Sequence, residues 1–215
     1  MMFRRDLGPL TLLLLPGAAF FAAFFVLPMA RLVLIGGSGK LGWGAYTALL
    51  TDGNYVRSLL STLAVAVATT AATLLVGGIA GVFLQRHRFP GQSALVALLT
   101  FPLAFPGVMI GFMVIMVAGR QGVIGELSQT LVGERLVFAY SMTGLFMGYV
   151  YFSIPRVLLT IMAAAEKLDP RLEEAARSFG ASPWQVVRDV IIPGLIPAFL
   201  ASGAICFATA VGAFG

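Results

Sequence analysis

Few residues of this chain could perform chemistry, and they are scattered. The only histidine, His87, lies in the short basic segment QRHRFPGQ, so an apolar segment cannot hold the serine–histidine pair of an intramembrane protease. The acidic residues outside one polar loop are Asp6, Asp52, Glu126 and Glu134. Residues so far apart do not form a cluster of metal ligands. We therefore expect no catalytic residue, no metal site and no cofactor, and we predict that the protein is not an enzyme.

The segment GGSGKLG has only a superficial likeness to a nucleotide-binding loop. The pattern G-x-x-x-x-G-K-[ST] would require glycine at position 34 and serine or threonine at position 41, where the chain has Leu34 and Leu41. The chain encodes no such ATP site, so energy for any ATP-driven activity must come from a partner.

The composition is that of a membrane protein. Hydrophobic residues make up 59% and charged residues 11% of the 215 residues, whereas soluble domains have roughly 25% charged residues. The formal charge of +5 comes without a run of five basic residues and without alternation of basic and aromatic residues, which excludes nucleic acid as a partner. The single cysteine, Cys206, cannot form an intrachain disulfide and is expected to pack in an apolar segment.

Apolar segments of sufficient length predict transmembrane helices, since a bilayer core needs about 20 apolar residues. Arg4 and Arg5 precede the first segment as in a signal peptide, but its 25 residues exceed a signal's apolar region, so we interpret it as a retained helix. We predict an all-α polytopic helix bundle forming one transmembrane domain over residues 1–215. The five predicted spans are about 10–34, 59–84, 94–118, 137–155 and 194–214.

The distribution of lysine and arginine predicts the orientation, because basic residues are enriched in short cytoplasmic loops. With the N-terminus inside, nine basic residues are cytoplasmic and five are outside. This bias places the loop after the fourth span in the cytoplasm. The cytoplasmic set is Arg4, Arg5, Arg86, Arg88, Arg156, Lys167, Arg171, Arg177 and Arg188, and the outer set is Arg31, Lys40, Arg57, Arg120 and Arg135.

Prolines interrupt two of the predicted spans. They are Pro102 and Pro106 in FPLAFPG, and Pro193 and Pro197 in IIPGLIP. Each proline removes a backbone donor, so these helices bend, either as packing kinks or because the third helix lines a pathway. Almost no ionisable side chain lies inside the spans, which argues against an ion-coupled carrier. Arg156 is placed at the cytoplasmic end of the fourth span, as a topology anchor rather than a substrate ligand.

The polar loop of residues 166–193 predicts two short helices joined by a turn. Asp169-Pro170 is a helix start, and Leu172, Ala175, Ala176 and Phe179 then form one apolar face. Gly180 ends that helix, and Ser182 with Gln185 forms a capping box that starts the next. The second helix is expected to present Trp184, Val187, Val190 and Ile191 along one side. The apolar face either lies in a partner's groove or packs on the protein's own helices or on lipid headgroups.

The stretch EAARSFGASPWQVVRDVIIP resembles the EAA loop in the membrane subunits of bacterial binding-protein-dependent ABC importers. Their pattern is E-A-A, three residues, G, nine residues and I-x-L-P. Glu174, Ala175, Ala176 and Gly180 match it, and the last element is represented by Val190-Ile191-Ile192-Pro193. The flanks SIPRVLLTIMAAAEKLDPRLEEAA and GAICFATAVGAFG are also similar.

The resemblance implies that the loop forms coupling helices on a separate ATP-hydrolysing subunit. It implies contacts to that subunit from Glu174, Ala175 and Ala176, a turn at Gly180, and a coupling role for the neighbouring Phe179, Ser182 and Trp184. It also implies two copies of the ATPase subunit, a second permease subunit that is identical or a sister chain, and a periplasmic binding protein that delivers substrate to the inner membrane.

The segments RFPG and GAFG are similar to the branch that transports polyamines, phosphonates, ferric iron and sulfate-like anions. Members of this branch usually have six spans with both termini in the cytoplasm. Because five are predicted here, we expect a fragment or a truncated product whose last residue lies outside. The alternative function is a membrane scaffold or assembly protein whose cytoplasmic hairpin recruits another partner.

Overall fold

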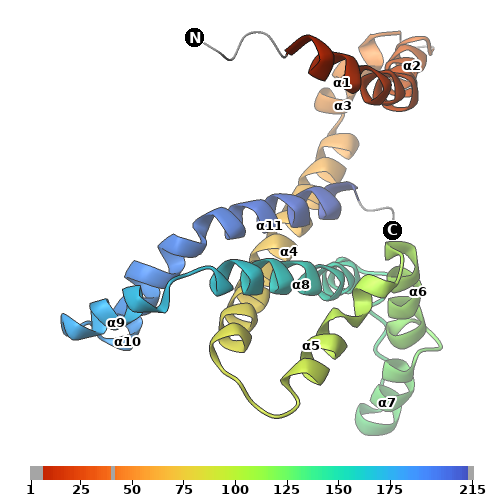
Figure 1. Cartoon of the computed structure of the whole chain (residues 1–215). Coiled ribbons are helices and arrows are strands. Elements are labelled where there is room, and N and C mark those ends of the chain that lie inside the picture. The colour runs from red at the N-terminus through yellow and green to blue at the C-terminus, as the bar shows by residue number, and fades with distance from the viewer. Residues whose placement is uncertain (1–6, 40–41, 213–215) are drawn as a thin grey trace. The chain divides into compact units, whose positions relative to one another are not determined.

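The computed structural model describes residues 7–39 and 42–212, and every element in this part of the chain is a helix (Figure 1). Five helical stretches are long and apolar enough to cross a membrane. This confirms the prediction of an all-α polytopic protein. Of the sequence predictions, those on Arg4, Arg5, Asp6, Lys40, Leu41 and the last residues of the fifth span fall outside the described residues. The five stretches are Leu14–Gly37, Gly53–Arg86, Gly107–Leu131, Met142–Glu166 and Pro183–Gly212.

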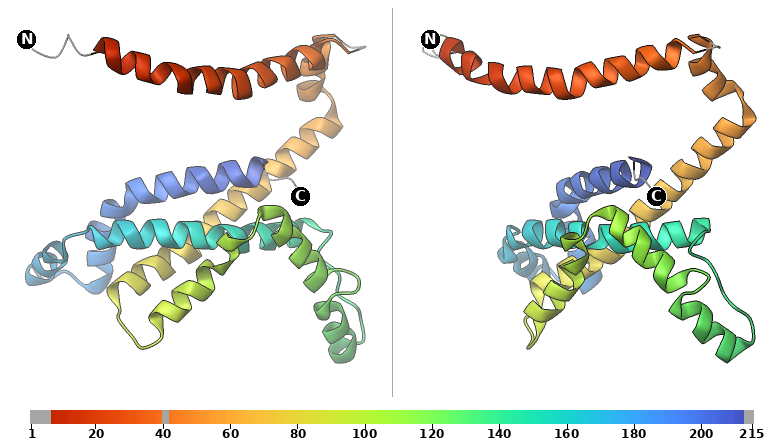
Figure 2. Two further views of the ribbon diagram at one scale, coloured as in Figure 1. Left: turned by 45° about the vertical axis from the view of Figure 1, so that its right-hand side comes forward. Right: turned by 90° about the vertical axis from the view of Figure 1, so that its right-hand side faces the viewer.

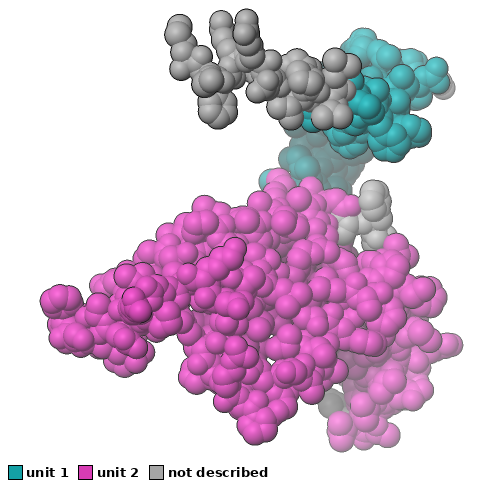
Figure 3. Space-filling view, viewed as in Figure 1, with its two compact units in different colours: residues 1–60 teal, residues 61–215 magenta. Residues whose placement is uncertain are grey.

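The chain divides into two compact units, Met1–Leu60 and Ser61–Gly215 (Figure 3). The boundary falls inside the long helix α4 (Gly53–Arg86). The prediction of a single permease domain over residues 1–215 stays a prediction.

The first unit is an apolar helix followed by a short helix that turns back on it. Helix α1 (Leu7–Phe21), the π-helical turn η1 (Ala22–Val26) and α2 (Leu27–Gly37) follow one another without a break. The π turn ends two residues before Pro28, where the missing amide donor disturbs regular helix bonding. Helix α3 (Gly44–Thr51) is tied to α2 because the Tyr46 hydroxyl donates to the Val33 carbonyl at 2.7 Å.

The second unit has its core where α4, α8 (Met142–Glu166) and α11 (Ile192–Gly212) meet. Helices α8 and α11 lie side by side (Figure 2). Helix α4 approaches α8 closely at Gly77, where a Cβ atom would lie 2.9 Å from Val157 Cγ1. Small residues permit such close contact between membrane helices. The buried core cluster is Val157, Ile161, Ala165, Val186, Ile191 and Leu195.

Prolines break the third apolar segment into separate helices instead of bending one helix. Helix α5 (Gln92–Thr100) is followed by the 3₁₀ turn η2 (Phe101–Ala104), and α6 (Gly107–Ala118) begins after Pro106. Phe105 and Pro106 have extended backbone, since proline disfavours helical geometry in the preceding residue. A further helix, α7 (Val123–Val132), follows.

The fourth apolar segment continues beyond the position at which the sequence places its end. Helix α8 passes through the buried Pro155 and extends to Glu166, whereas the predicted span ends at residue 155. Arg156 therefore lies ten residues before the end of α8, which is about 15 Å at the rise of an α-helix. A proline inside the helix removes one hydrogen bond, but the packing of the following apolar residues in the core maintains the helix.

Candidate functional site

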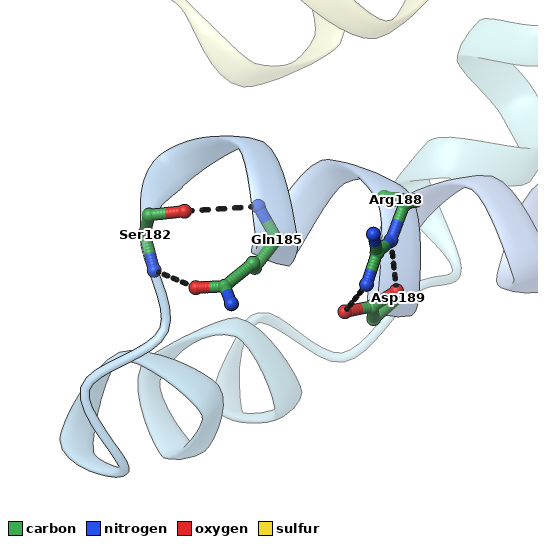
Figure 4. Close-up of polar contacts among 4 residues, drawn as sticks. All are labelled: Ser182, Gln185, Arg188 and Asp189. Atoms are coloured by element: carbon green, nitrogen blue, oxygen red, sulfur yellow. Dashed lines mark hydrogen bonds and ion pairs between the residues drawn. The ribbon is translucent and has the colours of Figure 1, made fainter.

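Two helices form a polar hairpin, residues 169–191, that leads into α11. Helix α9 (Pro170–Ser178) begins at Asp169, whose Oδ1 accepts from the Arg171 amide at 2.9 Å. Helix α10 (Pro183–Val186) begins at Ser182 with the predicted capping box (Figure 4). The Ser182 amide donates to Gln185 Oε1 at 2.7 Å, and the Gln185 amide donates to Ser182 Oγ at 3.4 Å. Both predicted helix starts are confirmed.

Gly180 makes the turn between the two helices. Its φ of +85° lies in the left-handed region that favours glycine. The Gly180 amide donates to the Arg177 carbonyl at 2.9 Å, and the Ala181 amide donates to the Ala176 carbonyl at 3.1 Å. These two bonds define a Schellman motif, which ends α9 and satisfies carbonyls that its last turn leaves without partners.

The hairpin exposes large apolar side chains beside charged ones. Phe179 is 92% exposed and lies outside the membrane-length stretches, and Trp184, at the start of the last stretch, is 65% exposed. Glu174 and Ala175 are also exposed, whereas Ala176 is half-buried and packs against the core cluster. Of the two small residues, one therefore faces the protein and the other is available to a partner.

The second helix of the hairpin differs from the sequence prediction of a single apolar side. Trp184 is exposed, whereas Val186 and Ile191 are 2% and 7% exposed and belong to the core cluster. After Val186 the winding changes to a π-helical turn, η3 (Val187–Ile191), in which the Ile192 amide donates to the Val187 carbonyl. Its wider winding shifts the side chains that follow away from the α-helical period.

Arg188 and Asp189 form an ion pair on this π turn. Arg188 Nε donates to Asp189 Oδ1 at 2.7 Å and Arg188 Nη2 donates to Oδ2 at 3.1 Å (Figure 4). Both side chains are more than half exposed, so the pair contributes little to stability.

An ion pair that the sequence did not predict holds α9 to α4. Glu173 pairs with Arg86, the last residue of α4, and also lies 3.8 Å from Arg177 Nη2. The side chains of Arg86 and Glu173 are 20% and 13% exposed. The two glutamates of EEAA thus separate: Glu173 faces the protein and Glu174 faces outward.

The prolines predicted to kink a pathway occupy different positions. Pro102 is buried in η2, and Pro106 directly precedes α6. Pro193 lies in the first turn of α11, two residues after η3, and Pro197 lies inside α11. A role in a pathway stays a prediction, since none of the four lines the cavity described next.

A cavity of about 630 Å³ lies between α6, α8 and α11. Apolar residues and glycines dominate its wall. Arg156 is the only formally charged residue among the described residues that line it. The polar residues in its wall are Tyr140, Tyr149, Ser153, Arg156 and Thr209.

Contacts within the second unit fix the Arg156 guanidinium in this cavity. Its Nη1 donates to Thr209 Oγ1 on α11 at 3.1 Å, and the Thr209 hydroxyl donates to the Ile205 carbonyl at 2.7 Å. Arg156 also lies over the Phe152 ring, 5.1 Å from its centroid. The sequence places Arg156 at the end of the fourth span because Pro155 precedes it, whereas α8 continues to Glu166. The apolar run up to Ala165 is the signal in the sequence that the helix continues.

Comparison with known proteins identifies the family. The profile of the binding-protein-dependent transport system inner membrane component family matches residues 74–215. The chain belongs to this family. It is 31% identical to the sulfate transport system permease protein CysT of Escherichia coli (strain K12) over 212 residues, which cover 99% of this chain and 75% of that protein.

This ABC importer permease is similar to further members. It is 33% identical to the molybdenum transport system permease protein ModB of Escherichia coli (strain K12) over 167 residues, or 78% of this chain and 72% of that one. A crystal structure of a bacterial ABC transporter that imports the acidic polysaccharide alginate matches with a TM-score of 0.78 at 17% identity, covering 95% of this chain and 73% of that one. That likeness shows the fold. Because the relatives are transport permeases, the predictions of a multi-pass permease and of a protein that is not an enzyme are confirmed.

Proposed function

We propose that the polar hairpin couples this ABC importer permease to ATP hydrolysis by docking on a separate ATPase subunit. In the complete transporter, two ATPase subunits would bind two permease subunits, either two copies of this chain or this chain and a sister. A periplasmic binding protein would deliver the substrate. The N-terminus and the hairpin would lie on the cytoplasmic side of the inner membrane.

The exposed Phe179 is the observation that carries this proposal. A phenylalanine that is 92% exposed at the end of a charged helix has no packing role within the described chain. Aromatic side chains that enter a pocket contribute much of the energy of protein interfaces, while surrounding charged groups mainly set orientation. Glu174 and Arg171 on the same helix, α9, are exposed and would supply such charged groups.

The hairpin can also transmit movement to the membrane helices. Its second helix enters α11 through η3, and Val186 and Ile191 are buried in the same cluster as Leu195 and Val157. A displacement of the docked hairpin would therefore move α11 and α8, because packed cores rearrange as units.

We propose a small polar solute as the transported molecule. The relatives named for sulfate and molybdenum transport support an oxyanion, in line with the phosphonate and sulfate-like substrates of the branch that the sequence resembles. Polyamines and ferric iron are the other substrates of that branch.

Co-purification tests the docking proposal. A tagged permease should retain its ATPase subunit when the two are produced together. Phe179→Ser should reduce the retained ATPase at least tenfold, since a buried aromatic anchor typically contributes about 2 kcal/mol or more. Phe89→Ser is the matched control, because Phe89 is also exposed but lies outside the hairpin. Equal retention by the Phe179→Ser variant and the wild type would refute docking through this face.

A further inference from the structure

Arg156 is a charged residue inside a membrane-length helix and not at its end. A charged side chain inside the hydrocarbon region is costly and is retained where it faces a water-filled space or a partner. Arg156 lies ten residues before the end of α8, inside the stretch Met142–Glu166 that is long and apolar enough to cross a membrane. Its guanidinium instead faces the cavity between α6, α8 and α11.

The neighbours of Arg156 orient its charge without neutralising it. Within residues 7–39 and 42–212, no carboxylate forms an ion pair with Arg156. The Thr209 hydroxyl donates its proton to the Ile205 carbonyl, so its oxygen acts only as an acceptor toward Arg156. Thr209 occupies one of the five donor positions of a guanidinium. The Phe152 ring supports one face of the group by a cation–π contact.

The walls of the cavity strengthen the effect of this charge. Most lining residues are apolar, including Val108, Ile110, Val114 and Leu145, and a poorly polarisable wall screens a charge less than bulk water does. Acidic residues are absent from the described lining. The field inside the cavity is therefore positive, which attracts anions and repels cations.

We propose that this cavity is an intramembrane binding site for the transported solute, that the solute is an oxyanion, and that Arg156 is its principal ligand. The proposal rests on the proposed function as a permease. The planar fork of a guanidinium matches two oxygens of a tetrahedral oxyanion, and Thr209 holds the fork toward the cavity. A polyamine or a ferric ion would meet only repulsion there.

The charge of the cavity can be measured without knowing the substrate. Ala208, which lines the cavity and is exposed, is replaced by cysteine in a Cys206→Ser background. Anionic and cationic thiosulfonate reagents of similar size are compared in the assembled transporter. Arg156→Gln should lower the ratio of the cysteine's modification rate with the anionic reagent to that with the cationic reagent about tenfold. This is the effect expected of one charge at short range in a partly screened site. Arg120→Gln, which removes an arginine outside the cavity, should leave the ratio unchanged.

Uptake into proteoliposomes tests ligand binding directly. With sulfate and molybdate as the probes and the cognate binding protein present, Arg156→Gln should reduce uptake of the transported probe at least tenfold while ATP hydrolysis without substrate continues. Arg156→Lys should keep the labelling ratio but transport several-fold less well, because lysine lacks the fork. Unchanged uptake by the Arg156→Gln variant, wild-type uptake of a polyamine instead of an oxyanion, or no labelling of the Ala208→Cys variant by either reagent would overturn the proposal.

The two readouts separate this proposal from the coupling role. If the hairpin does not couple to an ATPase, wild-type uptake and ATP hydrolysis fail while the labelling ratio still depends on Arg156. If instead a carboxylate of a partner subunit neutralises Arg156, the wild type shows no preference for the anionic reagent although its transport is normal, which refutes the anion site alone.

Discussion

The turn at Gly180 allows a quantitative test of the hairpin. A Cβ atom at Gly180 would have no atom within 4 Å, so Gly180→Ala introduces no clash. Its effect comes from the backbone, since φ of +85° is unfavourable for an alanine by about 1–2 kcal/mol. That energy lowers the ratio of closed to open hairpin by a factor of about 5–30.

The chain supplies a matched control at the end of α7. Gly133 has φ of +78° and also has open space around its Cβ position, so Gly133→Ala produces the same backbone strain away from the hairpin. Gly180→Pro is the stronger change, because proline cannot adopt positive φ and removes the amide that donates to the Arg177 carbonyl at 2.9 Å.

Hydrogen exchange and transport together form the assay. In nanodiscs, amides of residues 176–186 should exchange about 5–30 times faster in the Gly180→Ala variant than in the wild type, if exchange follows opening of the turn. ATP-driven uptake should fall in the same variant and be abolished by Gly180→Pro, although both proteins still insert. Gly133→Ala should change neither property. Normal uptake by the Gly180→Pro variant, or an equal loss in the Gly133→Ala variant, would refute the role of this turn in coupling.

Two further predictions concern packing within the second unit. Arg86→Glu should detach α9 from α4 and lower the free energy of unfolding by about 1–3 kcal/mol, because the pair is largely buried. Adding Glu173→Arg in the same chain should restore most of this loss. A double-mutant cycle of thermal stability measures the coupling between the two residues. Gly77→Val should destabilise the protein by about 1–3 kcal/mol, because its Cβ would lie 2.9 Å from Val157 Cγ1, whereas Gly17→Val, with open space around it, should have little effect on the melting temperature.

Features that depend on neighbouring residues could be predicted from the sequence. Asp169, Gly180 and Ser182 each determine a cap or a turn through bonds to residues within five positions, and the structure has all three as expected. The all-α class likewise follows from composition, because a bilayer leaves a long apolar segment few ways to satisfy its backbone other than a helix. The contribution of Phe179 and Trp184 to docking stays a prediction.

The effect of each proline on its helix does not follow from its position in the sequence. Pro102 and Pro106 end helices, but Pro155 lies inside one and Pro193 follows a π turn. The same residue type gives different results because the packing of the following residues decides whether a helix continues after losing one hydrogen bond. The predicted position of Arg156 at the end of a span depended on whether the helix continues after Pro155.

The sequence by itself determined the all-α class of the protein and the caps and the turn of its polar hairpin, because these depend on residue type and short spacing. Only the tertiary structure placed Arg156 against Thr209, 53 residues away, and Arg86 against Glu173. Such pairs depend on which faces of separate helices meet, and apolar spans with weak periodicity do not encode those faces in any local pattern. The cavity and its charge are consequences of that packing.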